Sequence, residues 1–293
     1  RKIIGWKSWI KMLLQIDREI TVKKCFEESS KYLGKLDCVV LLAFAVKKEK
    51  EFVLSHPEYT LSRREFETWK NAIKRRLEGE PIAYITGYRE FYSLCFSVNP
   101  STLIPRPETE HLVDQILSRR PSSLLDLGTG CGNIAVTVKY SLPDCDVYAT
   151  DISGEALKVA GENARRILGQ TEKIAFYQGD FFDPLPEYLK FDIIASNPPY
   201  VRSIDIEKLP REVRDFEPLY ALDGGEDGLD AYRKILGNAS KRLNKNGVII
   251  FEVDESILEG FINLCYEMSY ECQEVINDYS GRPRVAILAE KVF

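Results

Sequence analysis

A chain of 293 residues with 44% hydrophobic residues is long enough to form one large domain and a smaller one. Its best apolar stretch, residues 36–46, contains Asp37 and is far shorter than the ~20 residues of a membrane span, so we expect neither a span nor a secretory signal. Seven scattered cysteines without a Cys-x-x-Cys pair and only two histidines argue against a disulfide framework or a metal site, and indicate a cytoplasmic protein.

The charge is divided unevenly along the chain. The net charge is −5, yet the first 80 residues hold 18 Lys and Arg against 12 Asp and Glu, while the remainder holds 22 against 33. This division suggests a partner-binding part beside a part that carries the chemistry. A solvated charged surface without a function is an equal alternative.

The first 80 residues have helical periodicity, at residues 6–14 and again over the apolar residues 37–46. Ser62-x-x-Glu65 has the pattern of a capping box at the start of a further helix. We therefore predict a helical bundle over residues 1–80 and interpret it as a substrate-recognition domain. The aromatic residues and Gly87 in residues 81–105 predict a β-hairpin linker.

Strands and helices alternate over residues 106–293, which form the third expected segment. The helices include residues 153–168 and 229–243, and the seven candidate strands are Ser123–Leu127, Asp146–Thr150, Lys173–Gln178, Phe191–Ser196, Gly247–Val253, Tyr270–Ile276 and Arg284–Ala289. This alternation predicts an α/β fold, a doubly wound and mostly parallel seven-stranded sheet with helices on both faces.

A glycine-rich turn follows the first of these strands, and its residues are Gly128-Thr129-Gly130-Cys131-Gly132. Glycines allow the backbone to turn tightly and to approach a ligand. The second strand ends at Asp151, whose carboxylate can accept hydrogen bonds from both hydroxyls of a ribose. Ligands of such sheets bind at the carboxyl ends of the strands, so we expect a nucleoside-containing cofactor there.

The glycine spacing distinguishes between cofactors. A dinucleotide fingerprint reads G-x-G-x-x-G, whereas this turn reads G-x-G-x-G and has Asn133 at the third glycine position. The difference favours S-adenosylmethionine, and a structural turn of an unrelated α/β protein is the alternative. After the third strand, Asp180 can accept the exocyclic adenine N–H and Phe181 can stack on the ring, although a core aromatic is the simpler interpretation of Phe181 alone.

The fourth strand delivers Asn197-Pro198-Pro199-Tyr200 beside the glycine-rich turn. An amide or aryl amine nitrogen is a poor nucleophile because its lone pair is delocalised. The side-chain oxygen of Asn197 can accept one of its N–H groups and the carbonyl of Pro198 the other, while the prolines stiffen the loop. Tyr200 can pack on the flat substrate group. This loop predicts methyl transfer to a planar nitrogen by orientation, with S-adenosylhomocysteine as the second product.

These two motifs resemble those of class I amino methyltransferases. Three more segments, Gly79–Gly87, Leu103–Glu110 and Asp278–Arg284, look like the protein-(glutamine-N5) methyltransferases known as the HemK or PrmC family. The resemblance implies a helical N-terminal domain and, as substrate, the glutamine of the Gly-Gly-Gln motif in peptide chain release factors. It also implies that the cofactor contacts Gly128 to Gly132, Asp151, Phe181 and Asn197, and that Asn197 to Tyr200 hold the glutamine amide.

Several alternatives stay open. The turn Glu252–Glu255 departs from the family pattern, so we assign it no role, and Arg106 and Glu108 are as compatible with a structural salt bridge as with ligand contact. A ribosomal protein could replace the release factor as substrate. The same loop chemistry suits an adenine-N6 or ribosomal RNA guanine methyltransferase, although the acidic catalytic part argues against a nucleic-acid partner. A non-catalytic scaffold is the third function considered. We expect a monomer.

Overall fold

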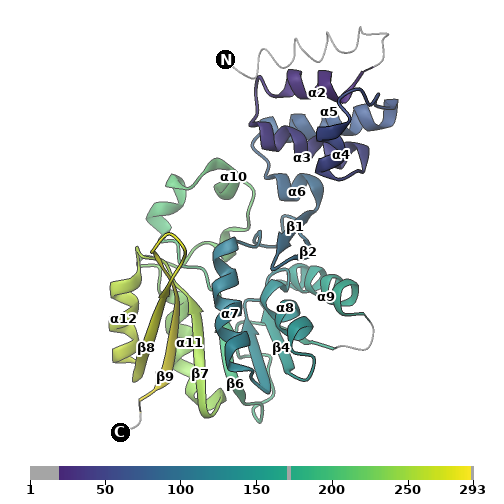
Figure 1. Cartoon of the computed structure of the whole chain (residues 1–293). Coiled ribbons are helices and arrows are strands. Elements are labelled where there is room, and N and C mark those ends of the chain that lie inside the picture. Colours follow the sequence, from purple (N-terminus) through teal and green to yellow (C-terminus); the bar gives the residue numbers. More distant parts are fainter. Residues whose placement is uncertain (1–19, 170–172, 292–293) are drawn as a thin grey trace. The chain divides into compact units, whose positions relative to one another are not determined.

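The computed structural model describes residues 20–169 and 173–291, so the helix expected at residues 6–14 lies outside the described residues. The chain divides after Thr86 into two compact units (Figure 1). Within the described ranges, none of the helices has the length and hydrophobicity of a membrane span.

The first unit is helical. α3 lies at its centre, where Leu41 and Leu42 are fully buried in a core that also contains Ile73 of α5. This position explains why the helix is apolar. The capping box is present: the Ser62 hydroxyl accepts from the backbone of Glu65, whose side chain accepts from the backbone of Ser62. The helices are α2 (Val22–Ser29), α3 (Lys35–Val46), α4 (Lys50–Ser55), α5 (Arg63–Leu77) and α6 (Ile82–Thr86).

α6 occupies residues that the sequence analysis assigned to a β-hairpin linker. The helix forms because the carbonyl of Pro81 accepts from the backbone of Tyr84 and Ile85, and the Arg75 guanidinium donates to the carbonyls of the same two residues. Tyr84 and Ile85 are thereby buried in the first unit. The aromatic pattern therefore belongs partly to a short helix.

The hairpin itself comprises β1 (Tyr88–Phe91) and β2 (Leu94–Ser97) and belongs to the second unit. Its two-residue turn, Tyr92 and Ser93, has positive φ at both positions, as a tight hairpin connection requires. The backbone of Ser97 exchanges two hydrogen bonds with the side-chain amide of Asn163 on α9, which fastens the hairpin to the α/β unit.

All seven expected strands are present and form one sheet in the order β5-β4-β3-β6-β7-β9-β8. The first five strands in this order are parallel, and β9 runs antiparallel to both of its neighbours, β7 and the edge strand β8. The strands are β3 (Ser123–Leu127), β4 (Asp146–Asp151), β5 (Ala175–Gln178), β6 (Phe191–Ser196), β7 (Leu243–Glu252), β8 (Tyr270–Asn277) and β9 (Pro283–Glu290).

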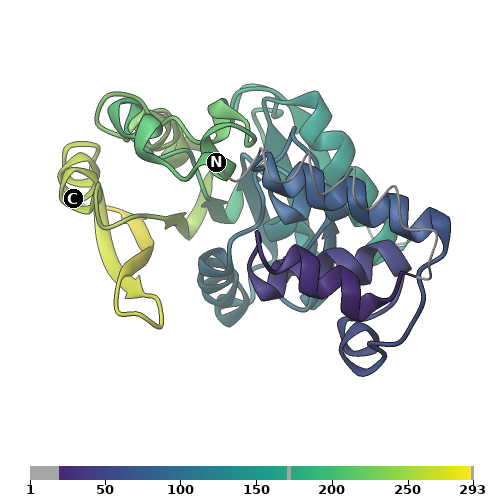
Figure 2. The same ribbon diagram turned by 90° about the horizontal axis from the view of Figure 1, so that it is seen from above.

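Helices cover both faces of this sheet (Figures 1 and 2). α7 and α9 both pack on α8, which lies between them on one face, and α11 and α12 pack together on the other. A cluster of three buried rings, Tyr232, Phe251 and Phe261, joins α11 and α12 to β7 in edge-to-face contacts. These helices are α7 (Glu110–Arg119), α8 (Asn133–Ser141), α9 (Gly154–Leu168), α11 (Asp230–Ala239) and α12 (Leu258–Glu267).

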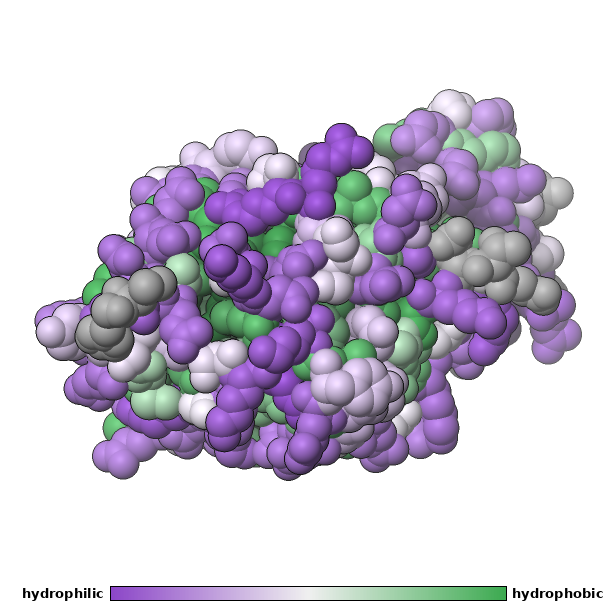
Figure 3. Space-filling view, turned by 90° about the horizontal axis from the view of Figure 1, so that it is seen from below, coloured by the Kyte–Doolittle hydropathy of each residue, from purple (hydrophilic) through white to green (hydrophobic). Residues whose placement is uncertain are grey.

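The register of the central strand brings the expected motifs together. Leu127 at the end of β3 pairs with Thr150 of β4 on one side and with Ser196 of β6 on the other. The Ser196 hydroxyl donates to the carbonyl of Leu127 across 2.7 Å, which ties the two strand ends. The glycine-rich turn, Asp151 and Asn197 therefore emerge side by side at the carboxyl edge. In the view of Figure 3, apolar residues show only in small patches between hydrophilic side chains.

Candidate active site

The glycine-rich turn has a conformation that requires its glycines. Gly128, Gly130 and Gly132 have φ values of 71°, 57° and 84°, which other residues rarely adopt. A Cβ atom on Gly132 would lie 3.2 Å from side-chain atoms of Val136 and Ala160, which pack against the turn. Residues at these positions other than glycine would strain the loop.

Asp126, which precedes this turn, is fully buried at the end of β3. Its Oδ2 accepts from the Thr129 hydroxyl at 2.6 Å and from the backbone N–H of Ala135 at 3.2 Å, and so connects the turn with α8. Burial raises the pKa of Asp126 to about 7, against the lowering effect of these two hydrogen bonds. Asp126 is thus a structural brace, to which the sequence analysis assigned no role.

Asp151 lies beside the turn and is only 7% exposed. Its Oδ2 accepts from the backbone of Gly130 at 2.8 Å and its Oδ1 from the backbone of Ser153 at 2.9 Å. Burial raises the pKa of Asp151, while these two backbone hydrogen bonds lower it. Each carboxylate oxygen has two lone pairs, so Asp151 retains acceptor capacity toward the cavity that it lines.

A cavity of about 700 Å³ opens at the carboxyl edge of the sheet. The expected site residues that line it are Gly128, Gly130, Asp151, Asp180, Phe181, Asn197, Pro198 and Pro199. Three of the expected cofactor-binding residues do not line it, and neither does Tyr200. The Thr129 hydroxyl donates to Asp126, Cys131 is buried and its carbonyl accepts from Asn163, and Gly132 is the N-cap residue of α8.

Asp180 and Phe181, the two residues expected to contact an adenine, both line the cavity. The contact of Asp180 with Lys234 is a feature that the sequence did not indicate. Phe181 has φ of +45°, an uncommon value for an aromatic residue, and packs partly against the core. Asp180 accepts from the Lys234 ammonium at 2.9 Å, and Lys234 on α11 also lines the cavity. One carboxylate oxygen of Asp180 is therefore already engaged.

Asn197 and Pro198 line a second cavity as well, of about 570 Å³, which contains Tyr200. These two residues thus lie between the two cavities. Burial raises the pKa of Tyr200, so its hydroxyl stays protonated. The Asn197 side-chain amide donates to the hydroxyl of Thr109 at 3.2 Å.

A second glycine-rich segment, Asp223–Gly228, packs directly on this loop, and the sequence analysis missed it. The backbone of Gly224 donates to the carbonyl of Val201 at 2.8 Å. A Cβ atom on Gly228, whose φ is +81°, would lie 2.5 Å from the carbonyl oxygen of Tyr200. Three glycines within six residues are the sequence signal for such a close backbone approach.

The structure answers the open question about Arg106. Its guanidinium forms an ion pair with Glu217, which is 5% exposed and also accepts from the backbone of Ile104 at 3.1 Å. Arg106 therefore has a structural ion pair, although it also lines the second cavity. Glu252 lines the same cavity and accepts from the Thr109 hydroxyl.

Comparison with known proteins decides the family. Residues 21–87 match the PrmC N-terminal domain and residues 119–278 match a methyltransferase domain. A release factor glutamine methyltransferase of Koribacter versatilis is 36% identical over 279 residues, which cover 92% of this chain and 98% of that protein. The chain belongs to the release factor glutamine methyltransferase family. The release factor glutamine methyltransferase of Moorella thermoacetica is 40% identical over 255 residues, which cover 85% of this chain and 89% of that protein.

Membership of this family makes the chain an S-adenosylmethionine-dependent protein methyltransferase, as the sequence analysis predicted. Solved structures confirm the fold. A methyltransferase from Pyrococcus furiosus aligns with a TM-score of 0.51 at 18% identity, over 74% of this chain and 97% of that one. A 16S rRNA methyltransferase of T. thermophilus, solved with AdoMet and guanosine, also has a TM-score of 0.51, at 16% identity over 70% and 50% of the two chains.

The first cavity fits the cofactor of this family. Asp151 has acceptor capacity left for hydroxyl groups. Gly128 and Gly130 have no side chains, and the space that a Cβ atom would occupy at either position is open. Phe181 offers an aromatic surface at the same cavity. These residues suit a ligand that has hydroxyl groups and a flat ring, as S-adenosylmethionine has.

The raised pKa of Asp126 predicts a pH-dependent stability. The unfolded carboxyl loses its proton near its ordinary pKa of 3.8, whereas the folded one keeps it until about pH 7, so the free energy of unfolding falls as pH rises through this window. Asp126→Asn cannot ionise, and we expect its stability to fall less between pH 4.5 and 7.5. Urea unfolding at both pH values measures this difference. Asp144→Asn, at an exposed position, is the control; equal pH slopes for Asp126→Asn and the unmodified chain would contradict the assignment.

Proposed function

We propose that the chain transfers the methyl group of S-adenosylmethionine to the side-chain amide nitrogen of the glutamine in the Gly-Gly-Gln motif of peptide chain release factors. The observation that carries this proposal is that Asn197 and Pro198 line two adjoining cavities. The first cavity contains the carboxylate and glycines suited to the cofactor, and the second can admit a side chain of the substrate. Curated relatives named for this activity support the choice of substrate.

The chemistry follows from the acceptors between the cavities. S-adenosylmethionine supplies an electrophilic methyl group on a positively charged sulfur. Asn197 and the Pro198 carbonyl accept the two amide N–H groups and orient the nitrogen, because proline has no N–H that would compete. Positive charge that develops on the nitrogen is stabilised by these fixed dipoles. The hydroxyl of Tyr200 stays protonated, so the proposal includes no tyrosinate base, and the methylated nitrogen releases its proton to solvent water after transfer.

The cofactor contacts are also proposed. Asp151 accepts from the ribose hydroxyls, Phe181 stacks on the adenine, and Asp180 accepts the adenine amino group with the carboxylate oxygen that Lys234 leaves available. Thr129, Cys131 and Gly132 act indirectly by holding the turn. We further propose that residues 1–80 recognise the protein substrate.

Mass spectrometry tests the substrate. Purified release factor is incubated with the chain and isotopically labelled S-adenosylmethionine, in parallel with ribosomal proteins, ribosomal RNA and DNA. We expect one methyl group on the glutamine of the Gly-Gly-Gln motif. Labelling confined to nucleic acid or to a ribosomal protein would overturn the proposal and identify one of the alternatives.

Asn197→Ala tests the role of the amide. Loss of an oriented dipole lowers rates by about 100-fold or more, and we expect that fall in methyl transfer with retained folding. Asn238→Ala, at an exposed position on α11, is the matched control and should leave the rate unchanged. Full activity of Asn197→Ala, measured as single-turnover methyl transfer, would show that the assigned role is wrong.

Gly228→Ala tests the brace under the loop. The new Cβ would overlap the Tyr200 carbonyl, so the loop must shift, and a shift of this kind costs about 100-fold in rate. Cofactor binding, measured by calorimetry, should change little because neither Gly228 nor Tyr200 lines the first cavity. The control is Gly161→Ala in α9, where a Cβ meets nothing within 4 Å. Equal rates for the two variants would contradict the bracing role.

A further inference from the structure

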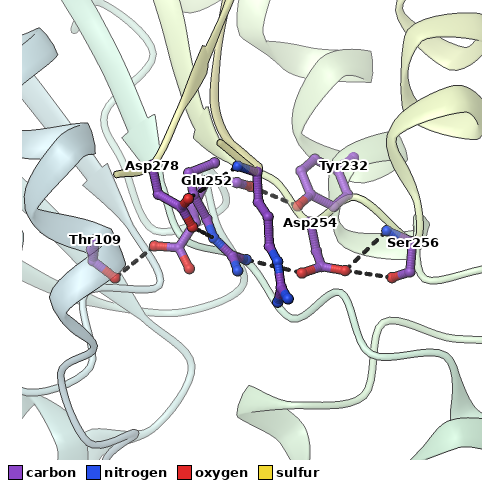
Figure 4. A network of polar contacts seen from close by, with 8 residues as sticks. Thr109, Tyr232, Glu252, Asp254, Ser256 and Asp278 are labelled. Atoms are coloured by element: carbon purple, nitrogen blue, oxygen red, sulfur yellow. Dashed lines mark hydrogen bonds and ion pairs between the residues drawn. The ribbon is translucent and has the colours of Figure 1, made fainter. Parts of the chain in front are cut away.

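Three side chains far apart in the sequence form a hydrogen-bonded chain that ends at Asn197. The Thr109 hydroxyl donates to Oε2 of Glu252 across 2.6 Å, and the Asn197 Nδ2 donates to the same hydroxyl oxygen across 3.2 Å. Thr109 and Glu252 are each 1% exposed. In Figure 4, the side chain of Thr109, at the start of α7, points toward the carboxylate of Glu252 at the end of β7.

The chemistry of the three groups gives this chain a direction. An ionised carboxylate only accepts hydrogen bonds, so Glu252 commits the single proton of the Thr109 hydroxyl. The hydroxyl oxygen can then only accept, and Asn197 must turn its NH₂ group toward it. The carbonyl oxygen of the same amide is consequently left to face away from Thr109.

We infer that Glu252 and Thr109 are positioning residues that hold the Asn197 amide in the one orientation that can accept the N–H of the substrate. The inference rests on the proposed function of Asn197. If the amide turned over, a donor would replace the acceptor and would oppose the substrate N–H groups. The pair therefore selects which end of the Asn197 side chain the substrate meets.

Glu252 is itself held firmly, as the role requires. Its backbone carbonyl accepts from the Tyr232 hydroxyl at 2.7 Å, and Glu252 stands opposite Val285 in the antiparallel pairing of β7 with β9. Next to Val285, Arg284 donates to Asp254 at 2.9 Å and to Asp278 at 3.1 Å, which fixes the turn after β7. A carboxylate whose backbone is fixed in this way can impose an orientation on a neighbouring side chain.

The charge of Glu252 is sensitive to pH near neutrality. Burial raises its pKa to about 7, opposed by the Thr109 hydrogen bond and by Arg284 on β9. Two charged groups in the segment before α7 also act on it: Glu108 raises its pKa and Arg106 lowers it. The hydroxyls of Tyr200 and Tyr232 lie nearby and stay neutral, because burial and the charge of Glu252 raise the pKa of both. A protonated Glu252 can donate to Thr109, and the hydroxyl proton is then no longer committed. The rate should therefore rise with pH through about 7.

Thr109→Val tests the inference, because it keeps the shape and removes the hydroxyl. We expect kcat for release factor to fall about 10-fold or more, the scale of lost support behind a functional group, with cofactor affinity retained. Thr109→Ser restores a hydroxyl and should recover most of the rate. The matched control is Thr137→Val on α8, since the buried Thr137 hydroxyl has no hydrogen-bond partner among the described residues. Its rate should be unchanged.

Glu252→Gln supplies the second readout. Glutamine cannot ionise, so we expect the rise of kcat near pH 7 to disappear, whereas a purely structural role would leave the shape of the profile unchanged. Thr109→Val with the rate and pH profile of the unmodified chain would overturn the inference. So would loss of activity in Glu252→Gln alone, which would make Glu252 a substrate contact. Failure of the unmodified chain to methylate release factor would instead refute the proposed function.

Discussion

The parallel pairing of β3 with β4 and β6 is the constraint on which the site depends. Leu127 stands in register with Thr150 and Ser196, so these three residues lie at one level near the ends of their strands. The residues that follow them are Gly128, Asp151 and Asn197. A shift of one residue in either pairing would turn each side chain to the other face of the sheet. Hydrogen bonds from the backbone of Gly128 and Thr129 to the Thr150 carbonyl, both 2.9 Å, reinforce the arrangement.

Buried carboxylates determine much of the local geometry around these strand ends. Asp126 connects the glycine-rich turn to α8, Asp151 binds the turn from the side, and Glu252 fixes Thr109. Each loses hydration on burial, and each recovers part of this cost through directional hydrogen bonds. Such groups are costly for stability, yet they orient their partners more strictly than apolar packing does. The same residues that make the site ordered therefore make it sensitive to protonation.

Local patterns predicted most of the fold and the part of the site that follows strand ends. Periodicity located the seven strands, and glycine spacing with Asp151 identified the cofactor, because these signals depend on neighbouring residues only. The assignment of Ile82–Thr86 differed because aromatic residues suit a short buried helix as well as a hairpin. The position of Asn197 beside the turn was also predictable, since the carboxyl ends of neighbouring parallel strands meet at one edge of the sheet.

The remainder of the site arises from contacts between distant residues, which no local pattern encodes. Arg106 meets Glu217 and Thr109 meets Glu252 across 111 and 143 positions of the chain. Gly228 carries a visible signal in its glycine-rich segment, yet its partner Tyr200 is known only from the packing. Supporting groups are harder to predict than the residues that we propose contact cofactor and substrate, because a support needs only the correct atom at the correct place, from any element.

Cys131 has a consequence for the durability of such an enzyme. Sulfur nucleophiles are good acceptors of an electrophilic methyl group, and this cysteine belongs to the turn beside the cavity in which we propose that the donor binds. The thiolate is the reactive form, and burial raises the pKa of Cys131 to about 12, against the hydrogen bonds from the backbone that lower it. With 1% of its surface exposed, the thiol stays protonated and shielded. The fold thus protects the catalyst from alkylating itself.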